Sequence, residues 1–187
     1  MVVVALTLGV ALLRPAPAQD DERPLTGPAG PYRGRVVDST TDQALPDTAV
    51  LLYWQKLDER DIPRTFAFRE TLTGAQGEFL VDAAAIEGAL PPRALVPRIL
   101  AYKPGYTAFP RQMRHPPGAA SDPFTAGGGV IRLGPATTQD DRIEAFNLFF
   151  AGLQAASISN MDLPATNRLL LDELRWFGVR PPGDPKK

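Results

Sequence analysis

The sequence contains no cysteine and only one histidine, His115. The absence of cysteine excludes disulfides, thiolate metal sites, covalently attached c-type haem and a lipidated N-terminal cysteine. A catalytic zinc or iron site needs several side chains that converge on one ion, and one histidine is too few for the common ligand sets. We therefore expect no metal, no cofactor and no enzymatic activity, and we expect His115 to lie in a surface loop.

The chain also lacks an excess of either charge. It carries 20 Lys+Arg and 21 Asp+Glu, a formal net charge of −1, which gives no electrostatic basis for a nucleic-acid partner. The acidic groups at 20–22, 58–59 and 140–141 lack the spacing of a calcium loop. The glycine run at 127–129 lacks the lysine and helix of a phosphate loop. No nucleic-acid, nucleotide or calcium site is expected.

The longest uncharged apolar run covers residues 2–13, and Ala16-Pro17-Ala18 follows it with small-residue spacing. A run of this length is short for a membrane span but suits the core of a secretory signal. We predict a signal peptide at 1–18 with cleavage after Ala18, then a flexible leader at 19–31, with no membrane span left after cleavage. A buried N-terminal strand is the alternative. The signal predicts a periplasmic or extracellular protein.

Proline (20) and glycine (16) are frequent for 187 residues, which favours many short elements joined by turns. Segments rich in β-branched and aromatic residues recur without a helical period, and a charged loop is expected at 55–64. We predict an antiparallel β-sandwich over 32–135. Its expected strands lie at 32–38, 48–54, 65–73, 78–83, 94–102 and 130–134.

The last third of the chain has the period of helices. Thr138 and Asp141 have the spacing of a capping box, and Gly178 ends the second apolar stretch. We predict a helical hairpin at 136–178 and a disordered tail at 179–187. Two apolar stripes should bury each other: Ile143, Phe146, Phe150 and Leu153 in one, Leu170, Leu174 and Phe177 in the other.

Three further apolar residues of the hairpin stand beside these stripes: Phe149, Leu171 and Trp176. The apolar faces are therefore wider than one mutual seam needs. The surplus must pack either on the sandwich or on a partner, because a large apolar patch left in water is unusual in a monomer. These three residues form the candidate partner surface.

Pro104-Gly105-Tyr106 is predicted to be a structural turn, since proline fixes φ and glycine accepts positive φ. Together with the pieces at 34–52 and 71–81, the stretch at 99–109 resembles the carboxypeptidase regulatory-like domain. That resemblance implies a mainly β fold, an antiparallel seven-stranded transthyretin-like Greek-key sandwich, to which the helical hairpin is added. It implies an accessory domain, without a peptidase.

Two functions are compatible with these observations. The first is an exported, non-catalytic binding or structural module that engages a protein or cell-envelope component. The second is a small-ligand or carbohydrate-binding protein that uses an aromatic patch on the sandwich, for which Trp54 and Trp176 are candidate platforms. The oligomeric state stays open.

Overall fold

The computed structural model describes residues 32–82, 86, 89–91, 93–95, 97–110 and 129–179. The predicted signal peptide and leader, His115 and the tail beyond Val179 lie outside these residues. The described elements follow one another as β1 (Tyr32–Asp38), β2 (Ala49–Leu57), β3 (Pro63–Leu72), β4 (Glu78–Val81), β5 (Arg98–Tyr102), β6 (Gly129–Leu133), α2 (Gln139–Ala155), the short 3₁₀ helix η1 (Asn160–Asp162) and α3 (Pro164–Trp176).

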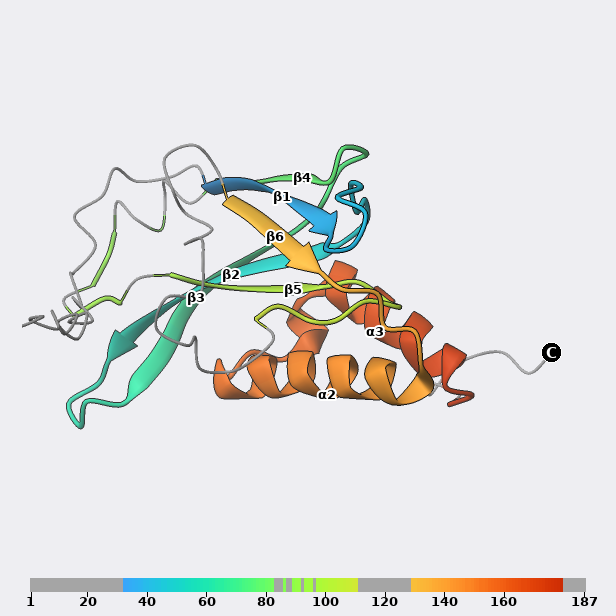
Figure 1. Cartoon of the computed structure of the whole chain (residues 1–187). Helices are drawn as coiled ribbons and strands as arrows, with labels where there is room; N and C mark the ends of the chain where they lie inside the picture. The colour runs from blue at the N-terminus through green and yellow to red at the C-terminus, as the bar shows by residue number, and fades with distance from the viewer. Residues whose placement is uncertain are drawn as a thin grey trace, which may run out of the picture.

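The elements form three layers, two sheets and a helical pair (Figure 1). One three-stranded sheet has the order β4-β1-β6, and the other has the order β3-β2-β5. The second sheet lies in the middle, with the first sheet on one face and α2 and α3 on the other. The prediction of a mainly β fold with a C-terminal helical pair is confirmed.

Strand β2 explains why the second sheet is the central layer. Every residue from 49 to 55 is buried, so successive side chains enter opposite cores. Val50, Leu52 and Trp54 contribute to the core between the two sheets. Leu51 and Tyr53 contribute to the core between the sheet and the helices. A strand with apolar residues on both faces can only be stable when both faces are covered.

The finer prediction of an antiparallel seven-stranded Greek key is not supported. Six strands occur in the described residues, their order does not support a Greek key, and β1 pairs with β6 in parallel. The stretch 106–109 after the Pro-Gly turn is not a strand because it forms only isolated bridges, Tyr106 with Pro135 and Phe109 with Ala101, and no continuous ladder. Thr107 N–H donates to the Gly134 carbonyl, whereas Phe109 exchanges two bonds with Ala101.

Half of the charged segment 55–64 is strand, so the loop is shorter than expected. β2 continues to Leu57 and β3 begins at Pro63, so only residues 58–62 make the connection. The strand register shifts between Trp54 and Gln55, whose partners are Ala67 and Thr65. Phe66 is therefore the extra residue of a β-bulge. The bulge explains why Phe66 and its neighbour both pack against the core between the sheets.

The helix ends match the predicted signals. Thr138 and Asp141 form a reciprocal capping box at the start of α2, with both side chain-to-backbone bonds at 3.1 Å. Gly178 follows α3 with φ +79°, and Val179 N–H donates to the Leu174 carbonyl in a Schellman motif. In the described part of the chain, no helix is long and apolar enough to cross a membrane.

The helical pair packs on the sandwich. Ala145, Phe149, Gly152 and Leu153 are the buried residues of α2, and they face the middle sheet. The sequence left open whether the hairpin packs on the sandwich or on a partner. The sandwich is the element that covers this buried face of α2.

Candidate functional site

The Pro104-Gly105-Tyr106 turn follows β5. Gly105 has φ +79°, and the Tyr106 N–H donates to the Lys103 carbonyl at 3.1 Å, which closes the turn. The Tyr106 ring is half-buried against the core between the sheets. Its hydroxyl bonds the Asp38 carboxylate, and burial together with that carboxylate raises the pKa of Tyr106. The turn is therefore a structural element that is tied to the end of β1.

The helical pair is joined by a buried ion pair. Arg142 of α2 donates from Nε and Nη2 to the two carboxylate oxygens of Glu173 on α3, at 2.6 and 2.8 Å. The Glu173 side chain is 1% exposed and that of Arg142 is 15% exposed. The carboxylate raises the pKa of Arg142 through these hydrogen bonds. Both charged groups are thus held in a bidentate geometry that fixes α2 against α3.

Arg142 also packs on an exposed aromatic ring. Its guanidinium carbon lies 3.6 Å from the Trp176 ring centroid, within the range of a cation–π interaction. Trp176 is 51% exposed, although the arginine beneath it is nearly buried. The indole is therefore held in place by a group that is itself anchored by Glu173.

More apolar side chains extend this surface. The Trp176 and Phe177 rings meet edge to face at 5.5 Å, and Phe177 meets Phe146 in the same way at 6.0 Å. Phe146 and Phe150 lie with parallel rings on α2. We call the set joined by these ring contacts the aromatic patch; its members are Phe146, Phe150, Trp176 and Phe177.

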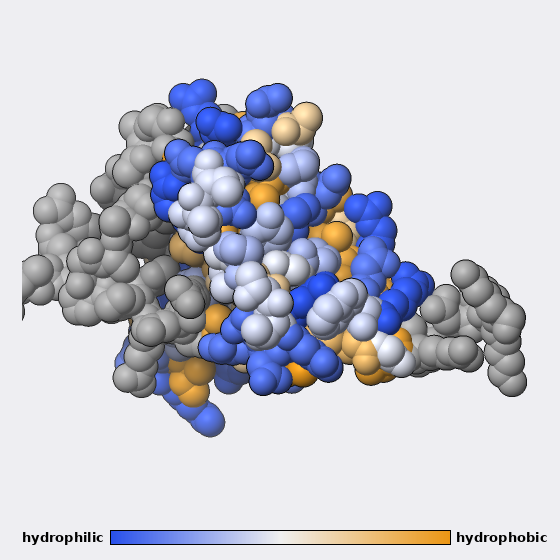
Figure 2. All heavy atoms as spheres, turned by 45° about the vertical axis from the view of Figure 1, so that its right-hand side comes forward, coloured by the Kyte–Doolittle hydropathy of each residue, from blue (hydrophilic) through white to orange (hydrophobic). Residues whose placement is uncertain are grey.

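Figure 2 shows this side of the molecule as largely hydrophilic, with pale and hydrophobic atoms gathered at the lower right of the coloured surface, where α3 ends. Asp141 and Glu144 lie on another side of α2, where they line a small pocket with Thr107 and Ala108. An exposed group of aromatic residues beside an arginine is typical of the centre of a protein-binding surface.

The three residues of the predicted partner surface lie in different environments. Trp176 is in the aromatic patch, and Leu171 is half-buried on α3. Phe149 is 1% exposed and stacks on Tyr102 at 4.9 Å, so it belongs to the interface with the sheet and is not available to a partner. Successive residues of a helix are about 100° apart, and this turns Phe149 about 100° away from Phe150 and about 120° away from Ile143.

The expected mutual seam of the two stripes forms only in part: Phe146 contacts Phe177 across the helices, and Leu153 and Leu170 lie in one buried cluster. Ile143 is 37% exposed, and Phe146 and Phe150 are only half-buried. The buried face of α2 instead follows Ala145, Phe149 and Leu153 at four-residue steps. The four-residue spacing of this face is present in the sequence. Because the face includes the small residue Ala145, it is less apolar in the sequence than the stripe that contains Phe146 and Phe150.

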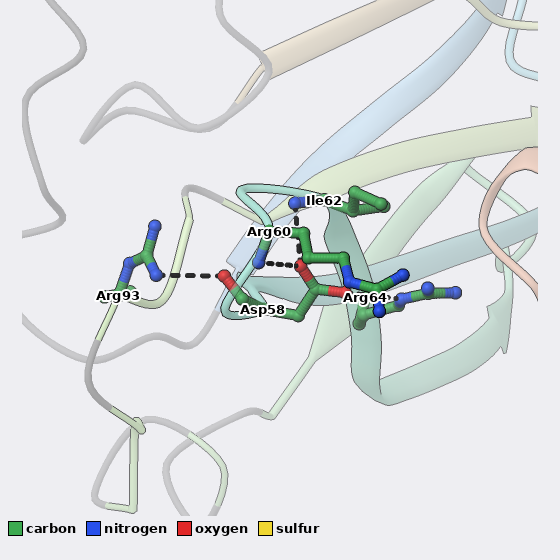
Figure 3. A network of polar contacts seen from close by, with 5 residues as sticks. All are labelled: Asp58, Arg60, Ile62, Arg64 and Arg93. Atoms are coloured by element: carbon green, nitrogen blue, oxygen red, sulfur yellow. Dashed lines mark hydrogen bonds and ion pairs between the residues drawn. The ribbon is translucent and has the colours of Figure 1, made fainter.

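A second polar cluster lies at the tip of the β2–β3 hairpin (Figure 3). The Asp58 carboxylate accepts from the N–H groups of Arg60 and Ile62 at 2.9 and 3.0 Å and from Arg64 Nε at 3.2 Å. These backbone N–H groups lower the pKa of Asp58. Arg93 donates to the Asp58 carbonyl at 2.9 Å. Both the carboxylate and the carbonyl of Asp58 accept hydrogen bonds that hold the turn in shape. The carboxylate therefore has a structural role, and no ligand is needed to explain it.

No group of three histidine or carboxylate side chains that could hold a metal ion occurs among the described residues. Asp58 organises a hairpin, and Asp141 caps α2, which lowers the pKa of Asp141. Trp54 is completely buried between the sheets, so it cannot act as a ligand platform. No family model, no curated protein and no solved structure matches the chain.

Proposed function

We propose that the chain is an exported, non-catalytic binding module that engages a protein partner of the cell envelope through its aromatic patch. The observation that carries the proposal is the exposed Trp176 ring on Arg142, which Glu173 anchors from below. Trp and Arg are the residues that most often dominate binding energy at protein interfaces. A ring that is already ordered loses little side-chain entropy when a partner covers it.

The position of the patch fits this role. Other residues of α2 and α3 form the buried core against the sheet, and of the patch members only Phe146 also packs against that core. The sandwich and the ion pair form a rigid support for it. The relation to carboxypeptidase regulatory-like domains belongs to this proposal as well, since such domains are accessory modules.

A small-ligand or carbohydrate site on the sandwich itself, away from the aromatic patch of the helices, is the weaker alternative. Burial of Trp54 removes one of the two candidate platforms for such a ligand. Carbohydrate binding at Trp176 would require a free ring face in a shallow cleft, and the arginine already occupies one face.

The proposal is tested by photo-crosslinking in the source organism. The full chain carries a benzoylphenylalanine in place of Trp176 in one sample, and in place of Arg33 in the control. Arg33 is an exposed residue of β1 on the outer sheet. We expect one protein to be crosslinked at 176 and not at 33, and we identify it by mass spectrometry.

The identified protein is then purified and titrated with the wild type and with Trp176→Ala. Loss of this ring should weaken binding by at least about 30-fold, equivalent to about 2 kcal/mol, as for interface hot spots. Equal crosslinking at both positions, or equal affinity of the two chains, contradicts the proposal. N-terminal sequencing of the native protein tests export separately, with Gln19 expected as the first residue.

A further inference from the structure

A pocket of about 330 Å³ lies where the middle sheet extends beyond the last turn of α2. Its floor is the helix-facing side of β2 and β5, and Gly152 and Ala155 of α2 form one wall. The β2–β3 hairpin reaches past the end of α2 (Figure 1), and its residues Ile62 and Pro63 form another wall. The volume is that of the smaller ligand pockets of proteins.

Close packing of α2 on β5 creates the edge of this pocket. A Cβ atom on residue 152 would lie 3.1 Å from Leu100 Cδ2, so glycine allows the helix to approach the strand. On the opposite wall, the Asp58 turn holds Ile62 by its backbone N–H. Both walls are therefore supported by fixed backbone and not by loose side chains.

The polar groups of the pocket are Tyr53, Gln55 and Arg98. Tyr53 and Arg98 are direct cross-strand partners of β2 and β5, so their side chains lie next to each other on the same face of the sheet. Burial raises the pKa of the Tyr53 hydroxyl, and the adjacent Arg98 opposes that rise. Tyr53 is thus a neutral hydroxyl beside a guanidinium.

No described lining residue carries a carboxylate, and Arg98 forms no ion pair within the described part of the chain. An arginine fork matches a planar carboxylate through two parallel N–H donors. The remaining lining is apolar and would contact a hydrocarbon body. A phosphate would usually require more donors than one arginine and one hydroxyl.

We propose that this pocket binds a small carboxylic acid with an apolar body, whose carboxylate pairs with Arg98 and whose body packs between Ile62 and α2. The pocket is separate from the aromatic patch, so this inference stands or falls independently of the proposed protein partner.

The test is an amide NMR titration of the ¹⁵N-labelled full chain with three probes. Benzoate has both an apolar body and a carboxylate, benzamide has the body without the charge, and inorganic phosphate has charge without the body. We expect benzoate to shift the amides of Arg98, Leu100 and Gly152, with a dissociation constant on the order of 1 mM or below. Benzamide should bind at least about tenfold more weakly, and phosphate should leave these amides unshifted.

Two variants and one control locate the site. Arg98→Gln should weaken benzoate binding at least about tenfold, which is typical of a lost charge-assisted hydrogen bond. Ala155→Leu should fill the pocket and weaken benzoate binding without changing any charge. Arg69→Gln removes an exposed arginine of the same sheet outside the pocket and should bind benzoate like the wild type.

Absence of benzoate shifts in the wild type overturns the inference. Undiminished binding to Arg98→Gln shows that this arginine does not recognise the carboxylate, and phosphate binding as strong as that of benzoate shows an anion site without an apolar part. Either result also overturns it. The fold of each variant is checked by its own amide spectrum, so a misfolded variant is recognised and replaced by Arg98→Lys.

Discussion

The carboxylate of Glu70 on β3 accepts a hydrogen bond of 2.6 Å from the backbone N–H of Thr166 in the first turn of α3. Its second oxygen accepts from Ala165 N–H at 3.1 Å. The N-cap residue of α3, Leu163, has no side chain that could do this. The sheet therefore caps the helix, and the cap ties the second helix to the edge strand of the sandwich.

Replacement of Glu70 by alanine should lower the free energy of unfolding by about 1–2 kcal/mol, the range for loss of a helix cap. Two N–H groups of α3 lose their acceptor in this variant. Glu70→Gln keeps one acceptor oxygen and should cost less. Urea unfolding measures both, with Glu144→Gln on the exposed side of α2 as the control. Equal stability of Glu70→Ala and the wild type contradicts the capping role.

The Arg142–Glu173 pair gives a prediction with a characteristic non-additive pattern. Removing either partner, by Arg142→Met or Glu173→Leu, leaves the other charge buried, and each single change should cost about 3–5 kcal/mol. The double variant removes both charges and should cost less than either single variant. A double-mutant cycle by chemical unfolding measures the difference. Simple addition of the two single effects would mean that the pair is not coupled.

Two residues with positive φ give opposite expectations. Gly105→Ala should destabilise the protein by about 1 kcal/mol, because φ is +79° there. No atom lies near the added Cβ, so the cost comes from the backbone conformation and not from a clash. Ser157 ends α2 with φ +54°, in the position that usually holds glycine. Ser157→Gly should therefore stabilise it by up to about 1 kcal/mol. Thermal unfolding of both variants in one buffer checks the two signs.

The elements that local chemistry determines were predictable from the sequence. The capping-box spacing of Thr138 and Asp141 predicts the start of α2, and β1 at Tyr32–Asp38 coincides with its expected range. The pairing of strands that are distant in the sequence was not predictable from it. Nothing local distinguishes a parallel β1–β6 pair from an antiparallel one, since both bury Val36 and Ile131 in the same way.

The candidate site was only partly predictable, for a similar reason. Trp176 stands out as an aromatic residue beside an apolar stripe. The ion pair that orders it was not recognised, because Arg142 and Glu173 are 31 residues apart and resemble surface charges in the sequence. The pocket residue Arg98 likewise acquires its meaning only from its neighbour Tyr53 on another strand.

The stability of the protein should depend on pH through Asp38. Its carboxylate accepts from the N–H groups of Thr40 and Thr41 at 2.7 and 3.0 Å, and these bonds hold the pKa of Asp38 below its usual value. A lowered pKa in the folded state means that the stabilisation is complete above the unfolded pKa of about 3.9 and is lost as pH falls through the folded value.

Asp38→Asn has no such titration, so the stability difference between wild type and variant should shrink as pH falls from 5 to about 2. Urea midpoints across this range measure it. Tyr106→Phe, which removes one donor to the same carboxylate, should show a smaller effect of the same sign. A difference that stays constant with pH contradicts the assignment to Asp38.

Removal of the helical pair tests whether the three layers form one cooperative unit. Truncation after Pro135 would expose the helix-facing side of the middle sheet, including Leu51, Leu100 and Tyr102, which are all buried in the full chain. A sheet face of this kind cannot stay in water without a large loss of hydrophobic stabilisation. We expect the truncated chain to aggregate or to lose its cooperative unfolding transition in urea.

Phe149→Ala in the full chain is the matched point variant, and it should cost about 3–5 kcal/mol because the ring is buried against Tyr102. Trp176→Ala should cost less than about 1 kcal/mol, since half of its surface is already in water. If the truncated sandwich instead unfolds at the same urea concentration as the full chain, the helices add nothing to the core, and the Phe149 face becomes the surface on which a partner must be sought.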